Sequence, residues 1–485
     1  MRNYEQYKRM VKFLFSIIVL SLEAAAFWYV WLHFYNQKME TPYNRSGHWL
    51  MVAVYGIFLV LFNILYGGLK VGYLRTGNMI YSQFLAALCA NIMAYLQITL
   101  LTKSFQNLIP LLAMTCIQFL MVCIWSFLST RFYRFLYPSR NVLLVYGEHP
   151  VANLMGKIHT RNDRFAIGEI VHISAGIREI KRKIDQYEGV VICDIPSSMR
   201  NVILKYSYEK SIRTYTTPKI SDVIIKSSES LHLFDTPLLL SRNNGLSFDQ
   251  RFVKRGVDLV LSLAALLFLS PVFMVTAAAI KLYDGGPVFY VQERCTKGGR
   301  VFRIYKFRSM IVDAEKEGHS IPAAEQDPRI TPVGRIIRAS RVDELPQVFN
   351  ILKGDMSIVG PRPERVEHVE LYTKQIPEFG YRMKVKGGLT GYAQVYGKYN
   401  TTAYDKLKLD LMYIQNYSLL LDIEIIFKTV KILFMKESTE GFGMEDAAAI
   451  AQGCGEGTET VRSCFGKRES DTESADKRQY ERNRL

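Results

Sequence analysis

The sequence is poor in cysteine, the residue that stabilises folds through disulfides or bound zinc. Only seven of its 485 residues are cysteines, and none lies in a CxxC pair or in a cysteine–histidine cluster with zinc-site spacing. This cysteine usage indicates a reducing compartment and excludes a fold held together by disulfides. The thiols are interpreted as small buried or incidental side chains. They are Cys89, Cys116, Cys123, Cys193, Cys295, Cys454 and Cys464.

Acidic residues are outnumbered by basic ones. Asp and Glu total 45 against 61 Lys and Arg, so the formal charge is +16. A nucleic-acid partner is not expected, because the chain has no nucleic-acid-binding motif and its basic stretches lie beside a membrane. Hydrophobic residues, 49% of the chain, cluster before residue 131 and at Leu259–Ile280. This distribution excludes a simple soluble enzyme, and the length suggests about three domains.

Polar interruptions are rare in the first 130 residues, where the pattern predicts four membrane spans over residues 1–135. The segment before the first span, the loop after the second and the segment after the fourth carry most of the Lys and Arg, so both ends of this four-helix bundle are expected in the cytoplasm. Glu23, in the first span, is interpreted as facing a neighbouring helix. The spans are Val11–Leu32, Trp49–Leu69, Met79–Leu101 and Leu108–Leu128.

Residues 139–240 have the alternating strand and helix pattern of a Rossmann-like α/β domain but lack its glycine fingerprint. Only Gly147 follows the first strand, and Glu148 stands where an anion would bind. We expect a structural or regulatory module without a working dinucleotide site. Residues 236–250 are predicted to be a linker. The predicted strands are Asn141–Tyr146, Ile167–Ser174 and Gly189–Ile195, with helices at Arg178–Tyr187 and Ser197–Tyr208.

A second apolar run, Leu259–Ile280, is long enough to cross the bilayer but contains Ser270-Pro271 at its midpoint. Proline removes a helical hydrogen bond, and a neighbouring serine can satisfy the freed carbonyl. The run therefore fits either a kinked span or a re-entrant helix over 257–281 that leaves the membrane on the side it entered.

Residues 285–400 carry the chemistry. Arg, Lys and Gly are dense there, which is typical of a site for a phosphorylated substrate, because guanidinium groups match phosphate oxygens and glycines let backbone N–H groups approach. The segment contains Lys306-Phe307-Arg308-Ser309-Met310, Asp343-Glu344-Leu345-Pro346-Gln347, Gly354–Glu364 with its Pro-Arg-Pro, and Gly387-Gly388-Leu389-Thr390-Gly391.

These strings, in this order, resemble the bacterial sugar transferase family, the monotopic phosphoglycosyl transferases, over about residues 248–436. With the preceding spans and α/β domain, the chain is similar to the long form of that family. The resemblance implies a mainly α, monotopic transferase domain whose Ser270-Pro271 break makes the membrane helix re-entrant. Cys295-Thr296 departs from the Val-Gly that relatives often carry.

The resemblance implies that a sugar 1-phosphate moves from a UDP-sugar to undecaprenyl phosphate. Glucose and galactose are the leading sugars, and N-acetylated sugars are left open. UMP would be released in the first membrane step of exopolysaccharide, capsule or O-antigen synthesis. It also implies an enzyme of the bacterial inner (plasma) membrane with its catalytic domain on the cytoplasmic face. A homodimer is compatible with it.

The resemblance assigns the nucleophile to Asp343, which would carry the phosphosugar covalently in a ping-pong reaction, and Mg²⁺ to Glu344. Arg338 and Arg362 are the expected phosphate clamps. Lys306 and Arg308 are second candidates for substrate binding.

Two other functions fit parts of the sequence. A membrane-bound nucleotide-sugar dehydratase or epimerase needs a YxxxK pair, and Tyr206…Lys210 and Tyr404…Lys408 have that spacing without the glycine fingerprint. A non-catalytic assembly scaffold is disfavoured because Asp343 and Glu344 are both present. Further helices are predicted at Phe379–Lys386, Ala403–Tyr413 and Leu419–Phe434, and a largely disordered tail at 437–485.

Overall fold

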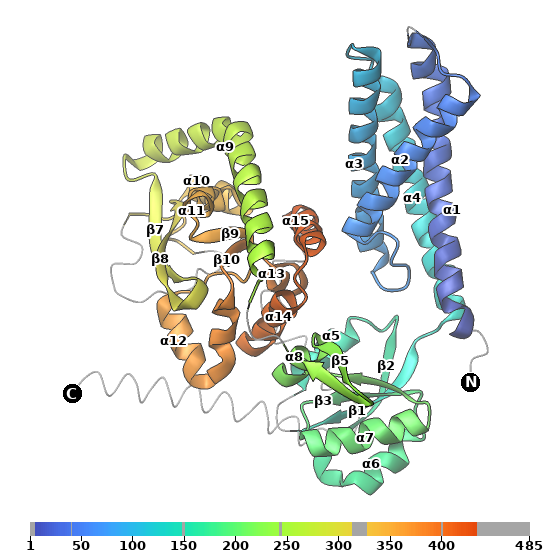
Figure 1. Cartoon of the computed structure of the whole chain (residues 1–485), viewed down its shortest axis with the longest axis vertical. Coiled ribbons are helices and arrows are strands. Elements are labelled where there is room, and N and C mark those ends of the chain that lie inside the picture. Colours follow the sequence, from blue (N-terminus) through green and yellow to red (C-terminus); the bar gives the residue numbers. More distant parts are fainter. Residues whose placement is uncertain are drawn as a thin grey trace. The chain divides into compact units, whose positions relative to one another are not determined.

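The computed structural model describes residues 5–39, 41–147, 151–241, 245–312, 327–398 and 401–433 (Figure 1). The chain divides into two compact units. Among the described residues, one unit contains residues up to Val11 and Phe127–Lys219, and the other contains Lys12–Ser126 and the residues from Ile220 to Leu433. The predicted tail at 437–485 lies outside the described residues.

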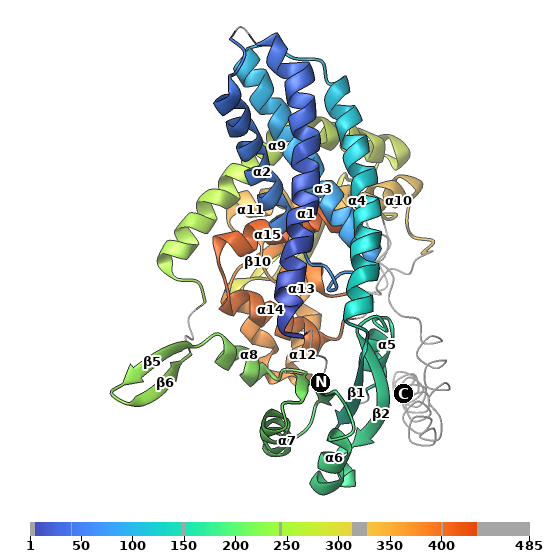
Figure 2. The same ribbon diagram turned by 90° about the vertical axis from the view of Figure 1, so that its right-hand side faces the viewer.

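Four long helices form the N-terminal part and lie side by side in both ribbon views (Figures 1 and 2). Their buried side chains share one apolar cluster that includes Phe27, Leu59, Ala90 and Met114. Small residues on the third helix let its neighbours approach closely. Each helix overlaps one predicted span. The helices are α1 (Lys8–Val30, extended by the turns Trp31–Tyr35 and Asn36–Lys38), α2 (Arg45–Tyr66), α3 (Thr76–Thr102) and α4 (Ile109–Leu136).

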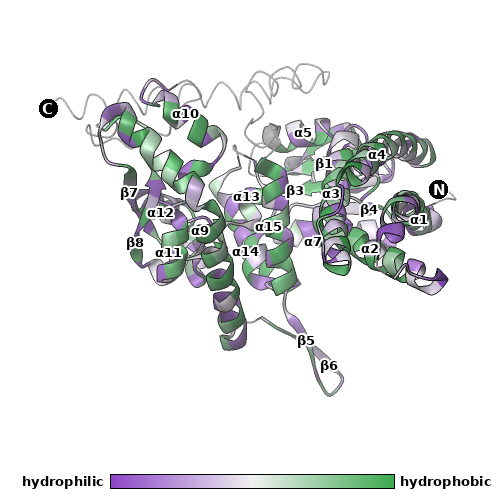
Figure 3. Ribbon diagram, turned by 90° about the horizontal axis from the view of Figure 1, so that it is seen from above, coloured by the Kyte–Doolittle hydropathy of each residue, from purple (hydrophilic) through white to green (hydrophobic). Residues whose placement is uncertain are grey.

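Five helical segments among the described residues are long and apolar enough to cross a membrane, and apolar residues dominate their ribbons in Figure 3. Four of them contain α1–α4, and the fifth is α9 (Phe248–Asp284). This content makes the chain a membrane protein.

The α/β unit is a parallel sheet in the order β2-β1-β3-β4, with helices between the strands, as predicted. A Cβ atom on Gly147 would lie 2.4 Å from the Asp194 carbonyl oxygen, so this glycine allows two loops to pack closely. Glu148 lies outside the described residues. The elements are β1 (Arg140–Tyr146), α5 (Ala152–His159), β2 (Phe165–His172), α6 (Ile177–Ile184), β3 (Gly189–Cys193), α7 (Ser197–Glu209) and β4 (Arg213–Thr216).

The linker predicted at 236–250 is wrong at both ends. Thr236–Leu240 is strand β6, which pairs antiparallel with β5 (Glu229–Leu233), and α9 begins at Phe248. Pro237 lies on β6, a strand of a two-stranded sheet, where a missing N–H costs little. The α/β prediction also ran to residue 240, whereas α8 (Ile220–Lys226) packs in the core of the C-terminal domain.

Helix α9 bends sharply along its length in Figure 1, and Pro271 lies inside it. Proline lacks the N–H that would bond to the Leu267 carbonyl, four residues earlier. The Ser270 hydroxyl donates to that carbonyl oxygen at 2.9 Å. The freed acceptor is therefore satisfied locally.

The C-terminal domain surrounds two small sheets. Strands β7 and β8 form an antiparallel hairpin, and β9 pairs parallel with β10. The helices predicted near 379–386, 403–413 and 419–434 are present, the first as a 3₁₀ helix. The elements are β7 (Phe289–Cys295), β8 (Val301–Phe307), α10 (Pro332–Ala339), α11 (Gln347–Lys353), β9 (Met356–Val359), α12 (Val366–Gln375), the 3₁₀ helix η7 (Pro377–Lys384), β10 (Gly387–Thr390), α13 (Tyr392–Tyr396), α14 (Ala403–Gln415) and α15 (Leu419–Leu433).

Candidate active site

Asp343 and Glu344 lie in a short 3₁₀ turn, Val342–Glu344, between α10 and α11. The turn is entered through Arg341, whose φ of 56° is left-handed. Helix α10 starts at the N-cap Thr331, whose hydroxyl accepts from the Gly334 N–H at 2.9 Å. The two acids are thereby held between two helices on a short, defined path.

Two cations hold the Glu344 carboxylate. Arg362 donates to its Oε1 at 2.6 Å and its Oε2 at 3.3 Å, and Lys306 donates to Oε1 at 3.2 Å. The Glu344 side chain is 12% exposed. Burial acts to raise the pKa of Glu344, but Arg362 and Lys306 outweigh it and hold that pKa well below its usual range. Glu344 is therefore a fixed anion.

Asp343 has the opposite electrostatics. Burial raises the pKa of Asp343, and the neighbouring Glu344 charge adds to that effect. Lys306, Arg338 and Arg341 act in the other direction without cancelling it. Two adjacent acids thus have their pKa values pushed apart, which is the pattern of carboxylates with different tasks in one site.

Lys306 is positioned through α11. The side-chain amide of Asn350, on that helix, accepts from the Tyr305 N–H at 3.0 Å and donates to the Arg303 carbonyl at 2.7 Å, which ties β8 to α11. Burial lowers the pKa of Lys306, opposed by Glu344. The lysine therefore points at Glu344 from a fixed strand.

Arg362 is positioned by the loop after β9. Gly360 lets this loop pack closely against the backbone at Lys386, because a Cβ atom on Gly360 would lie 2.6 Å from the Lys386 carbonyl oxygen. Arg382 donates to the Arg362 carbonyl at 2.8 Å and forms ion pairs with Asp410 at 2.8 Å and Glu364 at 3.4 Å. This buried network fixes the backbone of the clamp residue.

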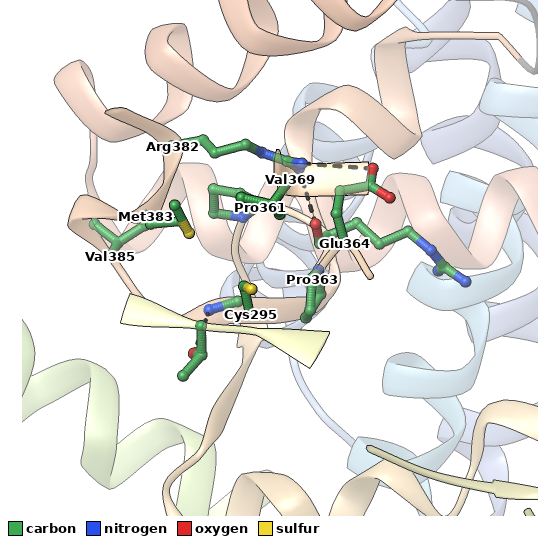
Figure 4. Close-up of a pocket in the computed structure, with 11 residues that line it drawn as sticks. Cys295, Pro361, Pro363, Glu364, Val369, Arg382, Met383 and Val385 are labelled. Carbon is green, nitrogen blue, oxygen red and sulfur yellow. Dashed lines mark hydrogen bonds and ion pairs between the residues drawn. The ribbon is translucent and has the colours of Figure 1, made fainter. Parts of the chain in front are cut away.

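A small hollow lies beside this network, and in Figure 4 Arg382 points toward Glu364 across it. Burial acts to raise the pKa of Glu364, but Arg382 and Lys406 outweigh it and lower that pKa to about 2. The hollow is therefore occupied by structural ion pairs. Its lining is Cys295, Thr296, Pro361, Arg362, Pro363, Glu364, Val369, Arg382, Met383, Val385 and Gly387.

The structure separates Arg308 from the other predicted site residues. Arg308 is 7% exposed and pairs with Asp284 at the end of α9. No contact with Asp343 or Glu344 is found for Arg308 in the described part of the chain. Arg308, directly after β8, therefore ties the C-terminal end of α9 to that strand. Asp343, Glu344, Lys306, Arg338 and Arg362 are brought together.

Two cations near the site were not singled out from the sequence. Arg341 acts electrostatically on both acids, and its position directly before them was a usable signal. Arg294 donates to the Pro363 carbonyl at 3.2 Å, and burial followed by the Arg362 charge lowers its pKa to about 10. Its approach to the Pro-Arg-Pro segment depends on the tertiary fold.

Comparison of the sequence with known proteins identifies relatives of the domain that carries this site. A family model described as "Bacterial sugar transferase" matches residues 249–436 of this chain. The uncharacterized sugar transferase EpsL of Bacillus subtilis is 37% identical over 188 residues, which cover 39% of this chain and 90% of that protein.

The chain belongs to the bacterial sugar transferase family.

Two further relatives of this sugar transferase have more specific names. The UDP-N-acetylgalactosamine-undecaprenyl-phosphate N-acetylgalactosaminephosphotransferase of Aeromonas hydrophila is 46% identical over 195 residues, 40% of this chain and 45% of that protein. The UDP-glucose:undecaprenyl-phosphate glucose-1-phosphate transferase of Klebsiella pneumoniae is 36% identical over 256 residues, 52% of this chain and 53% of that protein. The sugar transferase thus spans about half the length of these curated relatives.

Proposed function

We propose that this sugar transferase moves a sugar 1-phosphate from a UDP-sugar to undecaprenyl phosphate and releases UMP, as the first membrane step of surface polysaccharide synthesis. The observation that carries the proposal is the acid pair: Asp343, with a raised pKa, beside Glu344, a fixed anion held by Lys306 and Arg362. Relatives named for this reaction support it.

In the first step an Asp343 carboxylate oxygen attacks the phosphorus next to the sugar. An oxygen–phosphorus bond forms, the bond to the bridging oxygen breaks, and its electron pair leaves with UMP. A carboxylate whose pKa is raised is more basic and so a better nucleophile. Lys306, Arg338 and Arg362 supply positive charge where the leaving phosphate gains negative charge.

In the second step a phosphate oxygen of the polyprenyl acceptor attacks the same phosphorus. The new diphosphate bond forms as the bond to Asp343 breaks, and the carboxylate is regenerated. No proton is needed in either step. The order explains why one nucleophile serves two substrates that differ as much as a nucleotide and a lipid.

The acid pair Asp343 and Glu344 is suited to hold Mg²⁺, the expected cofactor. Among the described residues no group of three or more His, Cys, Asp or Glu side chains gathers. Mg²⁺ is commonly held by one or two carboxylates together with substrate phosphates. Glu344, with Asp343 beside it, would hold the ion, which when bound neutralises diphosphate charge. Arg362 and Lys306 currently occupy the Glu344 oxygens, so they would shift toward the substrate.

We further infer that α1–α4 span the membrane as a four-helix bundle and that α9 re-enters on the cytoplasmic side. The Ser270–Leu267 hydrogen bond at Pro271 supports a stable bend within the apolar segment. The basic loops support cytoplasmic ends for the bundle. UDP-sugars are made in the cytoplasm, so the site must face it.

Mass spectrometry after incubation with UDP-sugars, without lipid acceptor, tests the chemistry. We expect a hexose-phosphate adduct on Asp343, released by undecaprenyl phosphate, and no adduct in Asp343→Asn. Asp355→Asn is the matched control, because the Asp355 carboxylate pairs with the exposed Arg300 and no contact of it with Asp343 or Glu344 is found among the described residues. An adduct on another residue, or full UMP release by Asp343→Asn, would contradict the proposal. The sugars tested are glucose, galactose and N-acetylgalactosamine.

Cysteine labelling in oriented vesicles tests the topology. Single cysteines at Ser247, just before α9, and at Lys297, beyond its end, should both react with an impermeant maleimide from the cytoplasmic side. Labelling of Lys297→Cys from the opposite side alone would show that α9 spans the membrane.

A further inference from the structure

Cations from separate segments gather at the C-terminal end of α11. Arg255, on α9, donates to the Ile351 and Leu352 carbonyls at 2.6 and 2.7 Å. A Cβ atom on Gly354, the C-cap residue of α11, would lie 3.6 Å from the Arg255 Nη2 and 3.6 Å from the Lys386 Nζ. A guanidinium and an ammonium group that are distant in the sequence therefore point to one place.

A single threonine brings the turn between β7 and β8 to the same end of α11. The Thr296 hydroxyl donates to the Asp355 carbonyl at 2.8 Å and accepts from the Gly387 N–H at 3.3 Å. The turn that follows Thr296 carries Lys297 and Arg300, both of which are exposed. The four residues Arg255, Lys297, Arg300 and Lys386 form what we call the basic cluster.

Two acids accompany the basic cluster, and both already have partners. The Asp258 carboxylate accepts from the Ser357 hydroxyl at 3.0 Å and from the Ile358 N–H at 2.9 Å. The Asp355 carboxylate pairs with Arg300 at 2.7 Å. Four cations accompany only two acids, so the cluster keeps an excess of positive charge.

Lys386 is the member of the cluster with the clearest need for an anion. Its side chain is partly buried, and among the described residues no hydrogen bond or ion pair is found for its ammonium group. Burial lowers the pKa of Lys386, and the other cations of the cluster add to that effect, whereas Asp258 opposes it. An anion bound at this place would offset the repulsion among the cations.

The basic cluster lies next to the start of the longest apolar helix. Arg255 comes just before the apolar run Leu259–Ile280 of α9. Phosphate is the anion that matches such a cluster, because guanidinium groups bind its oxygens through directed hydrogen bonds and ammonium groups bind it as point charges. Two sources would supply a phosphate here: an anionic lipid headgroup at the membrane surface, or a free phosphate in solution.

We propose that the basic cluster is a binding site for a phosphate group, separate from the acid pair. The two ammonium groups and the exposed Arg300 supply hydrogen-bond donors, while Arg255 adds positive charge and caps α11. The cations that act most strongly on Asp343 and Glu344 belong to other segments. This inference therefore does not rest on the proposed chemistry.

Protection of Lys386 from acylation tests the site on the full chain in phosphatidylcholine nanodiscs. Peptide mass spectrometry follows the reaction with an amine-reactive ester, and the exposed Lys374 on α12 is the internal reference. One arm adds inorganic phosphate, with chloride at matched ionic strength as the baseline, and the other replaces part of the lipid with phosphatidylglycerol. We expect at least threefold slower acylation of Lys386, and none of this slowing at Lys374.

The arm that protects Lys386 identifies the source of the phosphate. Protection by phosphatidylglycerol alone assigns the site to a lipid headgroup, and protection by inorganic phosphate assigns it to a free phosphate. No protection in either arm, or equal protection of Lys374, overturns the proposal.

A pair of variants shows whether the cluster itself supplies the binding. Lys297→Gln removes an exposed cation of the cluster and should at least halve the protection of Lys386. Lys226→Gln, at an exposed position on α8, is the matched control and should leave the protection as in the wild type. Equal protection of Lys386 in the two variants overturns the proposal.

Discussion

At the scale of single residues, the neighbouring acids Asp343 and Glu344 differ in their pKa values because they have different charged partners. Glu344 accepts three charged hydrogen bonds, whereas no hydrogen bond to the Asp343 carboxylate is found among the described residues, and burial raises the pKa of Asp343. A carboxylate with strong partners is a poor nucleophile, and one without them is a better nucleophile. Position alone does not distinguish the two acids, but their partners do.

Replacing Arg362 with lysine tests the two-pronged contact to Glu344. Lysine keeps the charge but loses one of the two parallel hydrogen bonds. A charge-assisted bond contributes about 1.5–3 kcal/mol, so we expect roughly a ten- to hundredfold loss of kcat/KM for UMP release. Arg365→Lys, three residues along, is the control. Full activity of Arg362→Lys would show that the fork is dispensable.

The pH dependence follows from Asp343. In the proposed mechanism the ionised form of Asp343 is the nucleophile, so the rate should fall as the pH falls through the folded pKa of Asp343. Because burial raises that pKa, the acid limb should lie above the ordinary aspartate value of about 4. Rapid-quench measurement of the UMP burst against pH would show it. A burst that persists at full rate down to pH 4 would contradict a raised pKa.

At the scale of elements, the long apolar helix α9 is attached directly to the candidate active site. Arg255 donates to the Ile351 and Leu352 carbonyls at 2.6 and 2.7 Å, which caps the C-terminus of α11. Asp258 accepts from the Ser357 hydroxyl at 3.0 Å and the Ile358 N–H at 2.9 Å. The membrane helix thereby positions the helix that follows the acid pair.

Arg255→Ala should uncap α11. Two carbonyls lose a charged donor, and we expect a loss of about 1.5–3 kcal/mol in the free energy of unfolding, seen as a lower midpoint in detergent melts. Arg251→Ala is the matched control, since Arg251 bonds to the Ser247 carbonyl within its own helix. Equal midpoints for the two variants would show that the cap carries no stability.

The sequence predicts those features of the elements that local pattern encodes. The sequence predicted helices over Ala403–Tyr413 and Leu419–Phe434, which the structure contains as α14 and α15. The grouping of Asp343 with Lys306 and Arg362 came from the family resemblance of the charged strings. The position of Arg308 could not be predicted from the sequence, because its partner Asp284 is the last residue of a distant element, α9. The string Lys254-Arg255-Gly256-Val257-Asp258 directly precedes the apolar run Leu259–Ile280. Its partners lie about a hundred or more positions away, which local periodicity does not encode.

At the scale of the whole molecule, α15 joins the C-terminal domain to the N-terminal helices within one unit. Lys431 donates to the Ser82 hydroxyl at 2.6 Å. The Phe427 ring lies 5.7 Å from that of Phe62 and 5.4 Å from that of Tyr66. Helix α15 therefore contacts both α2 and α3, although its sequence is too short and too charged to span a bilayer.

Phe427→Ala should loosen this junction. The half-buried ring contributes about 1–2 kcal/mol by burial, so the thermal midpoint should fall and hydrogen exchange in α15 should increase. Leu433→Ala, on the same helix, removes a side chain that is 49% exposed and should change little. Unchanged exchange in α15 after Phe427→Ala would show that the ring contacts do not hold the helix.

The ion pairs of Arg362 and Lys306 with Glu344 would make substrate entry in the proposed reaction an exchange of partners. An incoming diphosphate would have to draw these cations away from an internal carboxylate that already binds them. This displacement would use part of the attraction and so weaken donor binding. The same carboxylate would bind the cations again when UMP departs, so the protein itself would assist product release.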